Sequence, residues 1–161
     1  MSKPAKNTNV MRALEAHGIQ YNHYDYDDSD NMIDGVTVAN MIGQEPGRVF
    51  KTLVTVSKNR EYFVFVLPVN TELDLKKAAK AVGEKSVEMI PVKQIEPVTG
   101  YIKGGCSPIG MKKQFRTVID ETALLYDTII FNGGKVGTQV EADPNLIKSV
   151  IPVTFEDITA N

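Results

Sequence analysis

A glycine-rich segment in the second half of the chain has the composition of a loop that can bind an anion. The segment reads Gly104-Gly105-Cys106-Ser107-Pro108-Ile109-Gly110. Its glycines and proline free backbone N–H groups to point at one spot, where they could hold an oxyanion, a carbonyl or a phosphate. Glycines also serve purely structural turns, so this composition by itself leaves both interpretations open.

A lysine, Lys51, lies near the start of the otherwise apolar run 49–56. Its ammonium group must either extend to water or meet an anion, and the spacing favours neither. A second glycine cluster, Gly133 to Gly137, also carries a lysine, but there the pattern indicates a hairpin turn.

Few side chains look like a nucleophile or a general base. Cys106 could be a nucleophile activated by nearby amide dipoles, although a lone cysteine more often fills a small apolar space. His17 precedes a predicted helix end and His23 lies on a predicted strand, so both are better explained as structural or surface side chains. One cysteine and two histidines provide no zinc-ligand spacing. We therefore expect neither a metal nor another cofactor.

Composition limits the ways in which this chain could meet nucleic acid. The net charge is −2, so a general positive field is absent and any contact with RNA must be local. Two basic clusters could supply that contact, although such a cluster, taken alone, is more often solvated surface. They are Lys76, Lys77 and Lys80, and Lys103, Lys112, Lys113 and Arg116. No run is apolar enough to span a bilayer, and the first residues are too polar for a secretory signal, so we expect a cytoplasmic protein.

The 161 residues are expected to form one domain, residues 1–161, of short helices and strands. Helices are predicted over 9–16, 37–42 and 75–82, with a helical turn over 91–96 and a last helix opening at Asp143-Pro144. Strands are predicted over 20–26, 49–56, 62–69, 87–90, 101–103, 117–119, 128–131 and 136–141, with turns at 57–60 and 132–134. Strict βα alternation is lacking, which favours an α+β domain with a mixed, mainly antiparallel sheet flanked by short helices.

Several blocks of sequence, taken together, carry a more specific pattern. They are Phe50-Lys51-Thr52-Leu53, Leu73-Asp74-Leu75-Lys76-Lys77-Ala78-Ala79-Lys80, Val87-Glu88-Met89, Thr99-Gly100-Tyr101, the run Gly104 to Lys113, and Gly133-Gly134-Lys135 through Val140-Glu141. In this order they resemble the YbaK/EbsC family of aminoacyl-tRNA deacylases, which shares its fold with the editing domain inserted in bacterial prolyl-tRNA synthetases. The resemblance covers nearly the whole chain and implies that fold, with a partly barrel-like sheet.

The resemblance also implies a substrate, a partner and a mechanism. The substrate would be a misacylated tRNA(Pro), with cysteine the amino acid removed by YbaK-like members and alanine by their synthetase-domain relatives. In cysteine-specific members the thiol of the substrate attacks its own ester, which would explain why no catalytic triad is visible. Prolyl-tRNA synthetase would recruit the protein in a ternary complex, and neither DNA nor a membrane is an expected partner.

The resemblance assigns roles to residues of the blocks. Lys51 would hold the terminal adenosine or its phosphate, while Gly105 and Ser107 would bind the aminoacyl carbonyl. Other residues would contribute to the substrate pocket: Tyr26, Thr52, Gly104, Cys106, Pro108, Gly134 and Asp143. Cys106 stands where the family pattern has an apolar residue such as isoleucine, and Asp143 is the nearest match to an acidic residue expected after the strand that ends at Glu141.

Three alternatives remain open from the sequence. The chain could be an Ala-tRNA(Pro) deacylase, or a module that binds aminoacyl-tRNA or a synthetase without turning it over. It could also be a hydrolase of another ester that depends on Cys106 as nucleophile.

Overall fold

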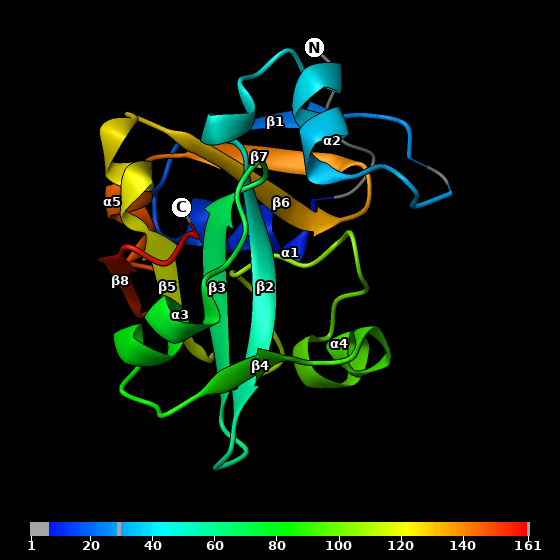
Figure 1. Cartoon of the computed structure of the whole chain (residues 1–161). Helices are drawn as coiled ribbons and strands as arrows, with labels where there is room; N and C mark the ends of the chain where they lie inside the picture. The colour runs from blue at the N-terminus through cyan, green and yellow to red at the C-terminus, as the bar shows by residue number, and fades with distance from the viewer. Residues whose placement is uncertain (1–6, 29, 161) are drawn as a thin grey trace.

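Two β-sheets form the framework of the protein. The computed structural model describes residues 7–28 and 30–160, so the ends of the predicted domain and Ser29 lie outside the described residues. The strands are β1 (Asn22–Asp25), β2 (Phe50–Ser57), β3 (Tyr62–Pro68), β4 (Val87–Met89), β5 (Arg116–Asp120), β6 (Ile129–Lys135), β7 (Thr138–Ala142) and β8 (Val153–Glu156). One sheet has the order β4-β2-β3-β5-β8 and the other β1-β7-β6 (Figure 1).

Short helices flank the sheets. They are α1 (Asn9–Ala16), α2 (Gly35–Met41), α3 (Leu75–Ala81), α4 (Val92–Thr99) and α5 (Pro144–Ile147), with 3-10 turns η1 (Pro46–Arg48) and η2 (Glu121–Leu125). The predicted cap of α3 is confirmed, because the Asp74 carboxylate accepts the N–H groups of Lys76 and Lys77. None of the helices in the described part of the chain is long and apolar enough to cross a membrane.

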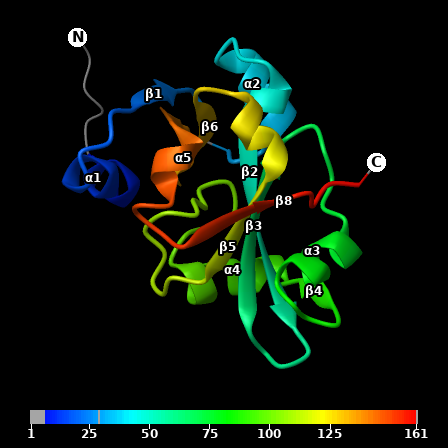
Figure 2. The same cartoon turned by 90° about the vertical axis from the view of Figure 1, so that its left-hand side faces the viewer.

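The long β2–β3 ribbon separates two parts of the core. Side chains alternate along a strand, so Phe50 and Val54 of β2 pack with α1 on one face, while Leu53 packs with α3 on the other. Figure 2 shows α1 and α3 on opposite sides of this ribbon. The same alternation places Lys51 and Thr52 on different faces of β2, and both lie near the start of this strand.

The predicted α+β class is confirmed. Antiparallel pairs join β1 to β7, β2 to β3, β2 to β4 and β6 to β7, whereas β3–β5 and β5–β8 are parallel. The sequence prediction missed β8, a short strand whose exposed positions alternate with half-buried ones. Helix α4 ends at Thr99, three residues beyond the predicted 91–96, and contains Pro97.

The strand predicted over 101–103 is wrong. The N–H of Tyr101 donates to the Thr99 hydroxyl (3.0 Å), and the Tyr101 hydroxyl donates to the carbonyl of Ile109 (2.6 Å). The N–H of Gly105 turns back to the carbonyl of Ile102 (3.0 Å). These local bonds fold the segment into a loop and leave no ladder for a neighbouring strand.

The turn predicted at 132–134 is also misplaced. These residues belong to β6, which has a register irregularity between Asn132 and Lys135. The Asn132 side-chain oxygen accepts the N–H of Gly134 (2.7 Å), which holds the irregular segment within the strand. The chain reverses later, around Gly137, whose φ of +90° suits glycine.

Candidate active site

A cavity of about 270 Å³ lies beside the start of β2. Its walls come from β2, the start of α2, the loop around residues 103–106 and the strands β6 and β7. Five of the residues predicted from sequence line it, namely Tyr26, Lys51, Thr52, Gly104 and Cys106. The fold therefore gathers half of the predicted site from segments that are far apart in sequence.

Two lysines line the cavity, the half-buried Lys51 and the exposed Lys103. The Nζ atom of Lys51 donates to the carbonyl of Thr71 at 2.5 Å, a neutral acceptor. Burial lowers the pKa of Lys51, and the nearby charge of Glu72 offsets part of this effect. The ammonium group is thus partly desolvated and poorly compensated, which is the state in which it would gain most from meeting an anion.

Two polar side chains that sequence reasoning did not single out complete the opposite wall. The Gln139 amide donates to the Tyr26 hydroxyl (3.2 Å), and the Asn132 amide donates to the carbonyl of Gly104 (2.8 Å). Burial raises the pKa of Tyr26, so its phenol stays neutral at physiological pH. A signal was present in the sequence for Asn132, which follows the apolar run 129–131. Gln139 does not stand out, because its strand also contains Thr138 and Glu141.

The loop predicted to bind a carbonyl is held tightly against the β6–β7 hairpin. A Cβ atom on Gly105 would come within 3.1 Å of the backbone nitrogen of Val136, closer than a comfortable contact. Glycine at 105 therefore allows the loop to pack closely enough for Asn132 to reach the Gly104 carbonyl. This bond fixes the loop segment that faces the cavity.

Cys106 lines the cavity with a protonated thiol. Burial raises its pKa to about 11, although a hydrogen bond with Thr99 opposes part of the shift. At pH 7 only about one molecule in ten thousand would carry the thiolate, which is the nucleophilic form. The burial of Cys106 therefore gives no support to its role as a nucleophile.

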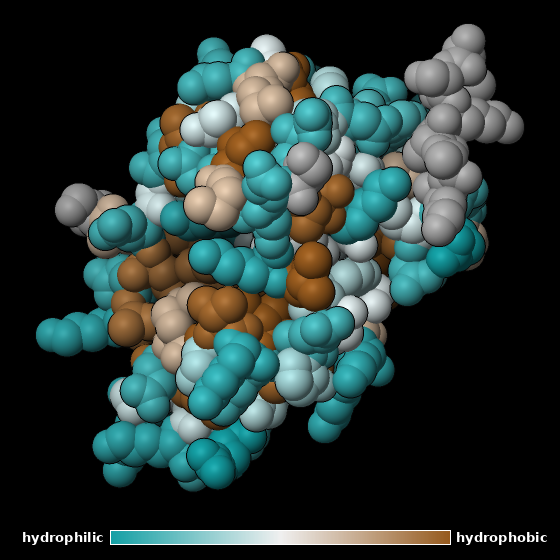
Figure 3. Space-filling view, turned by 90° about the vertical axis from the view of Figure 1, so that its right-hand side faces the viewer, coloured by the Kyte–Doolittle hydropathy of each residue, from teal (hydrophilic) through white to brown (hydrophobic). Residues whose placement is uncertain are grey.

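The hydroxyl of Thr52 is buried and has no hydrogen-bond partner among the described residues. Thr52 lies between the main cavity and a smaller, mostly apolar cleft of about 190 Å³, and it lines both. The cleft is formed by Leu53, Val54, Met89, Ile90, Val92 and Ile95. Figure 3 shows apolar side chains gathered on this face of the protein. An unpaired hydroxyl at such a junction is available to a ligand.

Four predicted residues lie behind or beside the cavity wall. Ser107 is fully buried and its Oγ accepts the N–H of Ile109 (3.3 Å), while Pro108 is buried next to it. Gly134 packs against Val10 of α1. Together with Gly105, these residues shape the loop and do not themselves line the cavity.

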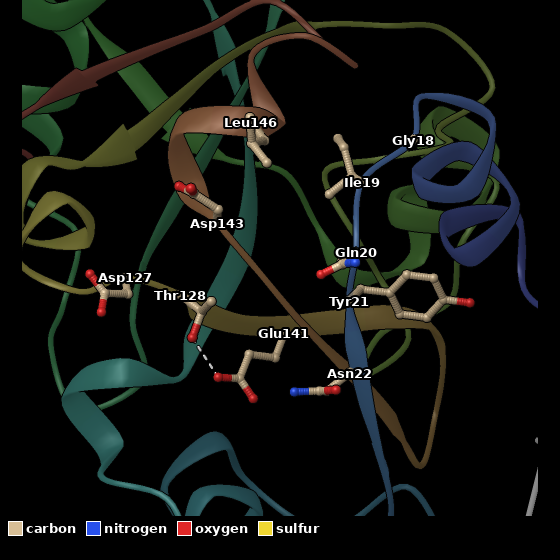
Figure 4. Close-up of a pocket in the computed structure, with 10 residues that line it drawn as sticks. All are labelled: Gly18, Ile19, Gln20, Tyr21, Asn22, Asp127, Thr128, Glu141, Asp143 and Leu146. Atoms are coloured by element: carbon tan, nitrogen blue, oxygen red, sulfur yellow. Dashed lines mark hydrogen bonds between the residues drawn. The ribbon is translucent and has the colours of Figure 1, made fainter.

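Asp143 lies elsewhere, in a larger and more open groove of about 820 Å³ (Figure 4). Its carboxylate caps α5 by accepting the N–H of Asn145 (2.8 Å). Glu141, on the same groove, accepts bonds from Arg48 (2.5 Å), Tyr24 (2.5 Å) and the Thr128 hydroxyl.

Burial opposes ionisation of Glu141, but these bonds and the Arg48 charge together lower its pKa. Glu141 is thus already paired with Arg48, Tyr24 and Thr128, which is typical of a structural network. For this reason the smaller cavity, with its half-buried lysine and its unpaired hydroxyl, is the candidate active site.

Comparison with known proteins decides which family has this arrangement. Residues 34–149 match the family described as the aminoacyl-tRNA editing domain, a span that includes all the predicted site residues except Tyr26. The chain belongs to this family. Editing is the removal of a wrongly attached amino acid from a tRNA, so the predicted family and the predicted activity, aminoacyl-tRNA deacylation, are both confirmed.

One relative is similar over almost its full length. It is described as "Putative Cys-tRNA(Pro)/Cys-tRNA(Cys) deacylase EbsC" of Enterococcus faecalis (strain ATCC 700802 / V583). The two chains are 48% identical over 157 residues, which cover 98% of this editing domain and 96% of the relative.

Solved structures share the fold at low sequence identity. One is described as "Crystal structure of a putative trans-editing enzyme for prolyl tRNA synthetase", with a TM-score of 0.82 at 23% identity over 99% of this chain and 100% of that chain. Another, described as hypothetical protein APE2540, has a TM-score of 0.85 at 18% identity over 94% of this chain and 99% of that chain. Both support the editing-domain fold.

Proposed function

We propose that this editing deacylase acts in trans on misacylated tRNA(Pro) and removes cysteine, with the thiol of the substrate as the nucleophile. The observation that carries the proposal is chemical: among the described residues, the cavity lining offers lysines and hydrogen-bonding groups but no activated nucleophile. The 48% identical relative, whose name specifies Cys-tRNA(Pro) and Cys-tRNA(Cys), supports the choice of amino acid.

The groups that could act as nucleophile or base are poorly suited to those roles. Cys106 has a pKa near 11 and Tyr26 a raised pKa, so both keep their protons. Asp34 also lines the cavity, but hydrogen bonds from the backbone and side chain of Thr37 lower its pKa, which makes it a weak base. Asp28 directs its carboxylate to the N–H of Met32 (2.9 Å). A substrate that brings its own nucleophile fits this set of groups.

The reaction we propose is an intramolecular acyl transfer. The sulfur of the cysteinyl group attacks its own ester carbonyl, a C–S bond forms, and the C–O bond to the ribose breaks. The thiol proton ends on the ribose oxygen, so the products are free tRNA and a cyclic thiolactone that water later opens to cysteine. Intramolecular attack carries a large effective concentration. The protein therefore needs only to hold the thiol close to the ester carbonyl and to stabilise the negative charge that develops on the carbonyl oxygen.

Particular residues would provide these two functions. The Lys51 ammonium would bind the terminal adenosine or its phosphate, because it is the partly desolvated cation of the cavity wall. The tightly held loop around Gly104 and Gly105 would place the aminoacyl group, and the free Thr52 hydroxyl would bond to it. Ser107 and Gly134 would not contact the substrate but would fix the shape of this loop.

The partner we propose is prolyl-tRNA synthetase. The net charge of −2 disfavours tight binding of free tRNA, and a ternary complex would supply the missing affinity. Salt-independent nanomolar binding of tRNA by the protein alone would contradict this proposal.

The test is a set of deacylation time courses with matched substrates. Cys-tRNA(Pro), Ala-tRNA(Pro), Ser-tRNA(Pro) and Pro-tRNA(Pro) are incubated with the protein, and the remaining aminoacyl-tRNA is measured. Serine differs from cysteine only by oxygen in place of sulfur, so rapid loss of cysteine alone supports attack by the thiol. Comparable loss of alanine would indicate a water-dependent deacylase, and binding without loss of any amino acid would indicate a binding module.

A further inference from the structure

A second basic region, away from the candidate active site, has the features of a surface for the ribose–phosphate backbone. A groove of about 620 Å³ lies between the β2–β3 hairpin, the end of α4 and the start of β5. Four cationic side chains line it, namely Arg60, Lys112, Lys113 and Arg116, and all four are exposed. We refer to this feature as the basic groove.

The charges of the basic groove are not neutralised within the described chain. The ion pairs among the described residues involve His23, Arg48 and Lys77, and none involves a cation of the groove. Lys112 donates to the carbonyl of Pro97 (3.1 Å) and Arg116 to that of Ala81 (3.1 Å). These neutral acceptors hold the side chains in place but leave their charges uncompensated. Among the described residues, Glu61 is the only acidic one that lines the groove.

An aromatic pair forms part of the groove wall. The rings of Tyr62 and Phe115 meet edge to face, with centroids 5.5 Å apart, and both side chains are partly exposed. Cations along a groove combined with partly exposed aromatic rings are the combination that binds nucleic-acid strands, through phosphates and through stacking. The other basic cluster predicted from sequence lacks this combination, since Lys77 is paired with Asp157 (3.0 Å) on the surface of α3.

The distance from the candidate active site suits one bound tRNA. Phe63 of the groove pairs with Thr55, which lies four residues along β2 from Lys51. At about 3.3 Å per residue the separation along the strand is about 13 Å, or about four steps of a nucleic-acid strand at 3.4 Å each. A tRNA whose 3′-terminal nucleotide occupied the cavity could therefore place the nucleotides that precede it along the groove.

We infer that the basic groove binds the ribose–phosphate backbone of the tRNA whose aminoacyl end occupies the cavity, an inference that rests on the proposed function. It reconciles an acidic protein with an RNA substrate, because the contact is confined to one face. The binding is independent of base sequence, as expected where cations meet phosphates.

The test removes two charges from the groove without removing any hydrogen bond of the fold. Arg60 has a φ of +67°, so Arg60→Asn keeps a residue that tolerates this conformation. It is combined with Lys113→Gln. The control variant, Lys76→Gln with Lys80→Gln, removes the same charge from exposed positions of α3. Each protein is assayed over a range of salt concentrations on Cys-tRNA(Pro) and on cysteinyl-adenosine, which cannot reach the groove.

The groove variant is expected to lose about tenfold in kcat/KM on Cys-tRNA(Pro) at low salt. The slope of log(kcat/KM) against log salt should become shallower by about 1 to 2, since each lost phosphate contact removes about 0.7 to 0.9. Activity on cysteinyl-adenosine should stay at the wild-type value, and the control variant should behave as wild type on both substrates.

Equal salt slopes for the groove and control variants would overturn the inference, as would a loss that extends to cysteinyl-adenosine. A loss seen only when prolyl-tRNA synthetase is present would also overturn it, because the synthetase would then occupy the groove. If the wild type cleaves neither Cys-tRNA(Pro) nor cysteinyl-adenosine, that separate result refutes the proposed function.

Discussion

The unpaired hydroxyl of Thr52 allows a prediction in which stability and activity change in opposite directions. Valine has the shape of threonine but no hydroxyl, so Thr52→Val removes a buried polar atom that has no partner in the fold. Such a group costs about 1–3 kcal/mol. Because the residue borders a cavity we take the lower end, about 1 kcal/mol, which corresponds to a rise in Tm of about 2–4 °C for a chain of this size.

The same substitution should impair deacylation. If the hydroxyl bonds to the aminoacyl group, its loss costs about 0.5–1.5 kcal/mol, or about two- to twelvefold in kcat/KM on Cys-tRNA(Pro). The assay pairs a thermal unfolding curve with deacylation kinetics on the same protein sample.

Thr55→Val is the matched control on the same strand. The Thr55 hydroxyl is fully buried and donates to the carbonyl of Phe63 (3.2 Å), so its loss should lower stability by about 1 kcal/mol and leave kcat/KM unchanged. If Thr52→Val instead lowered Tm and left activity at the wild-type value, the hydroxyl would have a structural role and the reasoning would be refuted.

Three further predictions concern ionisable groups. Burial lowers the pKa of Lys51 below 10.5, so deacylation should fall as pH rises through this lowered pKa. In the same window the free energy of unfolding should rise, because the unfolded chain keeps its proton longer. Lys51→Met should abolish that rise in denaturant titrations. Cys106→Ala should keep deacylation within about twofold of wild type, and iodoacetamide should label Cys106 appreciably only near its pKa of about 11; loss of turnover would restore the nucleophile hypothesis. Arg48→Met should cost about 2 kcal/mol by leaving Glu141 without its cation. Because the pKa of Glu141 is lowered by folding, its ionised form stabilises the protein above pH 4.5, and this stabilisation is lost as pH falls below that value. In Glu141→Gln this decrease in the free energy of unfolding should be absent.

The predictable parts of the fold are those governed by local chemistry. Helix α3 follows from its Asp74 cap and its alanine face, and the β2–β3 hairpin follows from two apolar runs around a polar turn. The segment 101–103 was mistaken for a strand because its composition suits one, whereas the outcome depended on bonds to Thr99 and Ile109. These bonds join a side chain to the backbone two and eight residues away, and the alternation of residue types does not indicate them.

The candidate site was predictable to a similar degree. Sequence blocks led to Lys51, Thr52 and Cys106, which do meet in one cavity. They could not show that Asp143 lies in a separate groove, since that depends on which side of β7 the chain leaves. The unpaired state of the Thr52 hydroxyl is likewise a property of its surroundings, and so is the raised pKa of Cys106.

The most direct test of the account is the initial rate of cysteine release from Cys-tRNA(Pro) by wild type and by Lys51→Met, at equal concentrations of folded protein. Wild type is expected to release cysteine and to leave Pro-tRNA(Pro) intact. Loss of a hydrogen bond to a charged group costs about 1.5–3 kcal/mol, so Lys51→Met should be slower by about 12-fold to 160-fold. Equal rates for the two proteins would contradict the assignment of the cavity as the active site.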